Sequence, residues 1–201
     1  FDGTRSVQAA VIVDRVGSRM IVSYRGGPFP DATDWLPIER VASARAVHAD
    51  TRWPSGTIAL FNAARVAGIP SVLDVEITDR MALERILPVT DHAIFSLAGF
   101  RDYTRTQDLK QGLAMIEACG ARVPAVTLNA DGVAWLDGGV LHRMQGFPVD
   151  AIDTTGAGDV FHGAYAYGLA TGMSITDAMR FASATAAIKC TRFGGGAGTP
   201  T

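Results

Sequence analysis

The sequence has few cysteines, no surplus of basic charge and no long apolar run. Its two cysteines, Cys119 and Cys190, cannot form a disulfide framework or a four-ligand zinc site, and they suit a reducing cytoplasm. The 18 Lys and Arg residues against 20 Asp and Glu give a net charge of −2, so neither nucleic acid nor a membrane surface is expected as a partner. No apolar run reaches the length of about 18 residues that a membrane span needs, and no basic and then apolar leader is present. We therefore expect a soluble cytoplasmic protein.

The hydrophobic residues are numerous enough for a packed core, and their periodicity predicts alternating strands and helices. They make up 48% of the 201 residues, against 19% for charged residues. Two apolar runs at 7–13 and 20–24 predict a β-hairpin, which needs further strands because a lone hairpin is marginal in water. The rest of the chain predicts strands at 44–49, 70–74, 92–95 and 123–128, helices at 54–67, 80–87 and 107–118, a hairpin at 133–144, and two helices starting near Gly158 and at Ser174. This alternation predicts an α/β fold with a mostly parallel, doubly wound sheet flanked by helices.

A glycine-containing segment, Asp153-Thr154-Thr155-Gly156-Ala157-Gly158-Asp159, precedes an apolar helix. Its small residues let the backbone approach a ligand, and the free N–H groups at a helix start bind anions. A carboxylate at Asp159 would repel a phosphate unless it takes a proton from the group that attacks that phosphate. The pattern therefore suits phosphoryl transfer to an alcohol. The alternative is that Asp159 only compensates the helix dipole and that the glycines only form a tight turn.

The same segment, followed by Gly163-Ala164, resembles the second signature of the PfkB (ribokinase-like) carbohydrate kinases. The similarity extends to Asp14 and Gly17, Leu73-Asp74, Val126-Thr127-Leu128 and Cys190-Thr191-Arg192-x-Gly194. It implies a ribokinase-like body with a small β-sheet lid, in which residues 1–37 are a partial lid and connection and residues 38–201 are the nucleotide- and substrate-binding core. It also implies that the N-terminal part of the full domain is missing here and that a homodimer forms through the lid.

The resemblance assigns roles to the residues of the glycine segment. Asp159 would be the general base that deprotonates a sugar hydroxyl. The main-chain amides of Gly156, Ala157 and Gly158 would stabilise the γ-phosphoryl group of ATP. Asp153 and Thr155, with carbonyl groups from residues 186–195, would hold a monovalent cation such as K⁺ behind the loop.

The resemblance places ATP along the carboxyl edge of the sheet, in keeping with ligand positions in open α/β sheets. The expected nucleotide-binding residues are Thr127, Asn129, Gly132, Thr155, Ser183 and Gly194. Asn129 stands where the family usually has Gly, and Asn tolerates the left-handed conformation best among other residues. Ser183 lies where relatives often have an Asn beside the adenine. The alternative for Ser183 is a small residue in a crowded helix–helix contact.

The sequence departs from the family at a motif that helps to organise Mg²⁺. Many relatives have Asn-x-x-Glu after the fourth strand, where this chain has Ser96-Leu97-Ala98-Gly99. Asp74 and Glu76, at the end of the preceding strand, are the expected substitutes because Mg²⁺ prefers carboxylate oxygens, waters and substrate phosphates. The alternative is that both carboxylates belong to a solvated strand end.

Within the family the sequence is most similar to sulfofructose kinases, notably at Ala49-Asp50-x-Arg52-Trp53 and Asp159–Ala164. This implies that Arg52 contacts an anionic group of a ketose such as 6-deoxy-6-sulfofructose, since a guanidinium fork matches an oxyanion. Ser23 replaces an assisting Asn, and Arg25 would compensate for it. The alternatives are a surface role for Arg52, a nucleoside kinase of the same fold, and a catalytically degenerate sugar- or nucleotide-binding relative. His162 is expected at a pocket edge or in packing.

Overall fold

The computed structural model describes residues 8–13, 19–24 and 31–200, and the chain divides into two units between Ala32 and Thr33. In the first unit, β1 (Gln8–Val13) and β2 (Arg19–Tyr24) form an antiparallel pair. The hairpin expected from the two apolar runs is therefore present. Asp14, Gly17 and Arg25 lie outside the described residues.

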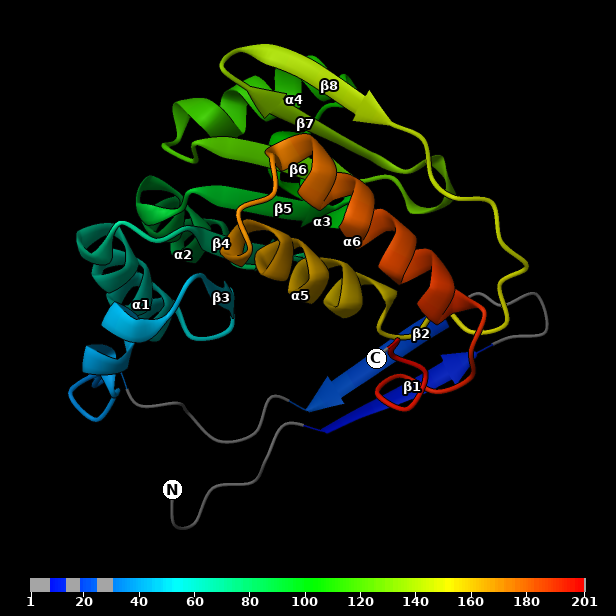
Figure 1. Ribbon diagram of the computed structural model, residues 1–201, viewed down its shortest axis with the longest axis horizontal. Helices are drawn as coiled ribbons and strands as arrows, with labels where there is room; N and C mark the ends of the chain where they lie inside the picture. The colour runs from blue at the N-terminus through cyan, green and yellow to red at the C-terminus, as the bar shows by residue number, and fades with distance from the viewer. Residues whose placement is uncertain (1–7, 14–18, 25–30, 201) are drawn as a thin grey trace. The chain divides into compact units, whose positions relative to one another are not determined.

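The second unit is built on a six-stranded sheet (Figure 1). Its strands follow one another across the sheet in chain order: β3 (Val47–Asp50), β4 (Ser71–Val75), β5 (His92–Ser96), β6 (Val123–Thr127), β7 (Val133–Asp137) and β8 (Val140–Met144). The pairs from β3 to β6 are parallel, and β7 and β8 complete the sheet in antiparallel pairing. The expected mostly parallel α/β sheet is confirmed, and the carboxyl ends of β3 to β6 share one edge.

Helices cover both faces of this sheet, with α5 (Ala157–Ala170) and α6 (Ile175–Cys190) together on one of them (Figure 1). The other face packs against α1 (Pro54–Ala67), α2 (Arg80–Ile86), α3 (Leu97–Thr104) and α4 (Leu109–Ala118). Short 3₁₀ helices lie at Ile38–Ser43, Leu87–Val89 and Asn129–Asp131. In the described part of the chain, no helix combines the length and apolar character needed to cross a membrane.

Each face of the sheet has its own hydrophobic core because strand side chains alternate between faces. In β4, Leu73 and Val75 enter the core beneath α1 to α4, while Val72 enters the core beneath α5 and α6. The alternation therefore places Asp74 on the α5 face, at the carboxyl end of its strand.

The helix limits follow local sequence signals. Helix α1 starts at Pro54 and ends at Gly68, whose φ is 67°. The expected cap of α6 is confirmed, because the Ser174 hydroxyl accepts a hydrogen bond from the Asp177 N–H at 3.1 Å. Helix α3 was not expected from the sequence. It starts directly after β5, where the Ser96 hydroxyl accepts a bond from the Gly99 N–H at 3.1 Å, and its eight residues give little periodic signal.

Candidate active site

The glycine segment forms the junction between a loop and the first turn of α5. Gly156 is the N-cap residue, with φ 78°, a left-handed conformation that glycine adopts without strain. A Cβ on Gly156 would lie 3.7 Å from Oδ2 of Asp159, so this carboxylate lies close to the start of the helix. The Asp159 side chain is exposed, and the positive end of the α5 dipole stabilises its charge.

Two of the three expected amides are available to a ligand. The N–H groups of Gly156 and Gly158 have no protein acceptor within the described residues, and no atom lies within 4 Å of a Cβ built on Gly158. The Ala157 N–H instead donates to the carbonyl oxygen of Thr154 at 3.2 Å, which closes the turn before the helix. The expected set of three amides is therefore corrected to two in this conformation.

Charged side chains from three neighbouring elements gather beside this helix start. Burial raises the pKa of Asp74, and the negative charges of Glu76, Asp159 and Asp50 raise it further, while His162 lowers it. The Oδ1 atom of Asp74 is buried and has no hydrogen-bond partner among the residues that the structure describes. The charge of Asp159 thus acts on Asp74, at the carboxyl edge of the sheet.

His162 is a part of this site that the sequence analysis placed only at its edge. Its ring is buried, and Nδ1 lies 2.7 Å from the carbonyl oxygen of Gly158 and 3.5 Å from Oδ2 of Asp74. Its Nε2 lies 3.4 Å from the carbonyl oxygen of Ile94. His162 therefore ties the first turn of α5 to β4 and β5. The available signal was its spacing of one helical turn from Gly158.

The chemistry of Asp74 and Glu76 fits a divalent cation held largely through water and phosphate. Both offer carboxylate oxygens, and Asp74 Oδ1 has unused acceptor capacity. Glu76 Oε2 accepts a hydrogen bond from the Ser96 hydroxyl at 2.7 Å, so its position is defined. Among the described residues, no three His, Cys, Asp or Glu side chains are grouped to hold a metal ion by themselves.

The oxygens of Asp153, one of the residues expected to hold a monovalent cation, are already engaged by protein groups. Oδ1 of Asp153 accepts the Thr155 N–H at 2.8 Å, and Oδ2 accepts the Gly194 N–H at 2.9 Å. The carbonyl oxygen of Asp153 accepts a hydrogen bond from Nζ of Lys189, also at 2.8 Å. A protein ammonium group thus already lies against Asp153, and the sequence analysis missed it. The signal was a lysine inside the otherwise apolar run Ala186-Ala187-Ile188-Lys189-Cys190.

Three of the six residues expected near the nucleotide, Thr127, Asn129 and Gly132, lie at or just beyond the carboxyl end of β6. The Thr127 hydroxyl donates to the carbonyl oxygen of Phe95 at 3.3 Å. Asn129 has φ 55°, which confirms the left-handed conformation expected for it. Gly132 also has a positive φ, and a Cβ there would lie 2.1 Å from the carbonyl oxygen of Met144, so only glycine fits. The Gly194 amide, in contrast, is directed to Asp153 rather than outward.

Ser183 lies in the middle of α6. Its Oγ is buried and lacks a hydrogen-bond partner among the described residues. A buried hydroxyl without a partner costs free energy. The position of Ser183 in a helix of small residues agrees both with a place beside the adenine and with a crowded helix–helix contact.

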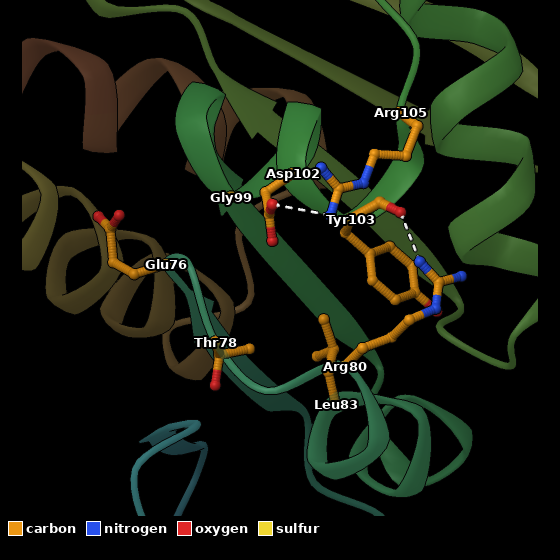
Figure 2. Close-up of a pocket in the computed structure, with 8 residues that line it drawn as sticks. All are labelled: Glu76, Thr78, Arg80, Leu83, Gly99, Asp102, Tyr103 and Arg105. Atoms are coloured by element: carbon orange, nitrogen blue, oxygen red, sulfur yellow. Dashed lines mark hydrogen bonds and ion pairs between the residues drawn. The ribbon is translucent and has the colours of Figure 1, made fainter.

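The position of the missing motif glutamate is occupied by backbone. A Cβ on Gly99 would lie 2.9 Å from the carbonyl oxygen of Val75 and 3.1 Å from that of Glu76. Beside it lies a cavity of about 30 Å³, shown in Figure 2. Its arginines are already engaged, since Arg105 pairs with Asp102 at 3.1 Å and Arg80 donates to the Tyr103 carbonyl at 2.9 Å (Figure 2). This cavity is water-sized and carries no free cation for a substrate.

Arg52 follows β3 at the same sheet edge, and its side chain is 71% exposed. Its Nε lies 3.2 Å from Oδ2 of Asp50, and its main-chain N–H donates to Oδ1 of Asp50 at 2.9 Å. Asp50 therefore positions the guanidinium and partly neutralises it. Ser23 lies on β2 in the first unit and is exposed.

An open, mostly parallel sheet with an acid and free main-chain amides at its carboxyl edge defines a ribokinase-like α/β protein. A model of the pfkB family carbohydrate kinases matches residues 2–201. The chain therefore belongs to the pfkB family.

Individual relatives agree with this assignment. The chain is 40% identical to the ribokinase of Lactococcus lactis over 75 residues, which are 37% of this chain and 25% of the relative. A crystal structure of a ribokinase homologue from Agrobacterium tumefaciens superposes with a TM-score of 0.91 at 33% identity, covering 99% of this chain and 66% of the other. The structure of Arabidopsis thaliana ribokinase complexed with ribose and ATP superposes with a TM-score of 0.86 at 25% identity, covering 98% of this chain and 67% of the other. The chain thus spans about two thirds of these solved structures.

Proposed function

We propose that the protein transfers the γ-phosphoryl group of ATP to a hydroxyl group of a sugar. The observation that carries this proposal is the placement of Asp159 beside the unpaired N–H groups of Gly156 and Gly158. Membership of the pfkB family supports a sugar as the acceptor, and the relative solved with ribose and ATP supports ATP as the donor.

In this proposal Asp159 accepts the proton of the attacking hydroxyl while the two glycine amides stabilise charge on the transferred phosphoryl group. The start of α5 contributes its positive dipole end to the same place. His162 holds the Gly158 carbonyl through its ring and so keeps the first turn of α5 in position. Asp74 and Glu76 would hold Mg²⁺, which when bound would neutralise phosphate charge.

Arg52 is our candidate for recognising an anionic group on the sugar. Its guanidinium is exposed, positioned by Asp50 and located at the same sheet edge as Asp159. The pair with Asp50 is formed through Nε, and a guanidinium fork suits phosphate, sulfonate or carboxylate oxygens. This support favours an anionic ketose over a neutral sugar.

The test is the substitution Asp159→Asn in the full-length protein. We expect turnover to fall by about 10²–10⁴ because the amide cannot accept the proton. The affinity for ATP, measured by calorimetry, should change little, since the glycine amides remain.

Asp137→Asn is the matched control, because Asp137 ends β7 at the opposite edge of the sheet. Near-normal turnover of Asp159→Asn would rule out general-base catalysis by this residue. No phosphorylation by the unmodified protein across a panel of neutral and anionic sugars would favour a degenerate binding relative instead.

A further inference from the structure

Lys189 is a fully buried lysine in the last turn of α6. The chain has only one other lysine, Lys110, which is exposed on α4. Burying an ammonium group is strongly unfavourable unless it is paired and hydrogen-bonded. A leucine or methionine would fill the same volume without this cost, so the charge itself needs an explanation.

The ammonium group of Lys189 is directed at Asp153, the first residue of the glycine segment. Its Nζ lies 2.8 Å from the main-chain oxygen of Asp153 and 3.9 Å from Oδ2 of its carboxylate. The main-chain N–H groups of Thr155 and Gly194 hydrogen-bond to this carboxylate and, with the positive charge of Lys189, lower the pKa of Asp153 to about 2. Asp153 is therefore ionised at neutral pH and balances the charge of Lys189.

Three segments meet at this ion pair. The Cys190 carbonyl at the end of α6 accepts the N–H groups of Ile152 at 2.8 Å and Asp153 at 3.2 Å. The Gly194 amide joins the C-terminal loop to the Asp153 carboxylate. Lys189 thus supplies one positive charge, coordinated by a carbonyl and a carboxylate, directly behind the loop that carries Gly156 and Gly158. Its position at a helix C-terminus further stabilises this charge.

We propose that the Lys189 ammonium is a built-in cation that takes the place of a bound monovalent ion behind the glycine loop. Carbonyl and carboxylate oxygens coordinate both potassium ions and ammonium groups, and the two cations are of similar size. Lys189 already hydrogen-bonds to the main-chain oxygen of Asp153, and its charge lies 3.9 Å from the Asp153 carboxylate. The phosphoryl transfer proposed above therefore does not require K⁺. This inference rests on the proposed function only for its activity readout.

The experiment compares the unmodified full-length protein with Lys189→Ala, Lys189→Met and the matched control Lys110→Ala in potassium, sodium and tetramethylammonium chloride. The unmodified protein and Lys110→Ala should have the same turnover in all three salts. Lys189→Ala should lose about tenfold or more in tetramethylammonium, because the loop loses its stabilising charge, and K⁺ should restore much of this loss. Lys189→Met should remain impaired, since its side chain fills the space without charge.

Thermal unfolding in the same salts gives a readout independent of catalysis. K⁺ should raise the melting temperature of Lys189→Ala in a saturable manner, and should affect the unmodified protein and Lys110→Ala equally. Failure of every protein to phosphorylate any sugar would contradict the proposed function, while the unfolding data would still decide the role of Lys189. A severalfold activation or a saturable stabilisation of the unmodified protein by K⁺ would overturn the built-in cation. This last measurement needs no variant and stands even where Lys189→Ala fails to fold.

Discussion

At the scale of single residues, the site combines exposed groups that can meet a ligand with buried groups that position them. Asp159 and Arg52 are exposed, whereas His162 is 3% exposed and Lys189 is fully buried. Both buried groups are bonded to main-chain oxygens of the glycine segment, His162 at Gly158 and Lys189 at Asp153. The geometry of the glycine segment is therefore held by charged or polar side chains beneath it.

Arg52→Ala tests whether this exposed guanidinium selects the substrate. We expect the KM for an anionic ketose to rise about tenfold, because the variant loses a charge-assisted contact. The KM for a neutral sugar and the affinity for ATP should stay unchanged, as determined by steady-state kinetics and calorimetry.

Arg85→Ala, on the exposed side of α2, serves as the control for loss of one positive charge. An equal rise in KM for neutral and anionic sugars would contradict a selective role for Arg52.

At the scale of elements, the unexpected helix α3 brings a different carboxylate near the position where the family motif has a glutamate. Gly99 lies in its first turn, where the backbone of Val75 and Glu76 leaves no room for a side chain. The Ser96 hydroxyl both caps α3 and donates to Glu76. The close contact between α3 and the end of β4 thus brings a different carboxylate, Glu76, to this part of the site.

Gly99→Ala should destabilise the protein by about 1–3 kcal/mol, because its Cβ would overlap the Val75 carbonyl and force α3 away from β4. Urea unfolding measures this change, and Mg²⁺-dependent ATP affinity should fall as Glu76 moves.

Gly163→Ala provides a matched helical control. Apart from its chain neighbours and the backbone of its own helix, no atom of the described residues lies within 4 Å of a Cβ at Gly163 in α5, so the substitution should stabilise the helix by about 1 kcal/mol. Equal stability of Gly99→Ala and the unmodified protein would show that α3 can shift without cost.

At the scale of the whole molecule, the shifted pKa values of several groups make stability depend on pH, and two of these groups, His92 and Asp153, give defined pH windows. Burial lowers the pKa of His92 to about 4, and its Nδ1 lies 2.9 Å from the hydroxyl of Tyr165 between the sheet and α5. The pKa of Asp153 is lowered to about 2. In both cases the group has a lower pKa in the folded protein than in the unfolded chain. As the pH falls, the unfolded chain therefore binds more protons than the folded protein, and acid favours unfolding.

We expect the free energy of unfolding to fall between pH 6.5 and 4 by an amount on the order of 3 kcal/mol from His92. The Asp153 contribution is present above pH 3.8 and is lost as the pH approaches 2. Chemical denaturation at a series of pH values measures both windows.

His92→Gln should reduce the loss of unfolding free energy between pH 6.5 and 4 and leave the loss below pH 3.8 unchanged. The amide can still pair with Tyr165 but does not titrate. An unchanged slope between pH 6.5 and 4 in this variant would assign the effect to other groups.

The alternating strands and helices, the glycine segment before α5 and the left-handed turn at Asn129 could all be predicted from the amino-acid sequence. These features depend on residues close in the chain, where periodicity, helix capping and the steric freedom of Gly and Asn decide the backbone. Helix α3 was not predicted, because a short helix that follows a strand directly has too few residues for a periodic signal.

Which side chains lie behind the glycine segment depends on tertiary packing. Lys189 meets Asp153 across 36 residues of chain, and His162 meets the Ile94 carbonyl across 68. Such contacts arise where separate elements pack together, and no local pattern determines which oxygen a buried lysine or histidine will reach. The physical reason is that burial forces each polar group to find whatever partner the packing brings within hydrogen-bond distance.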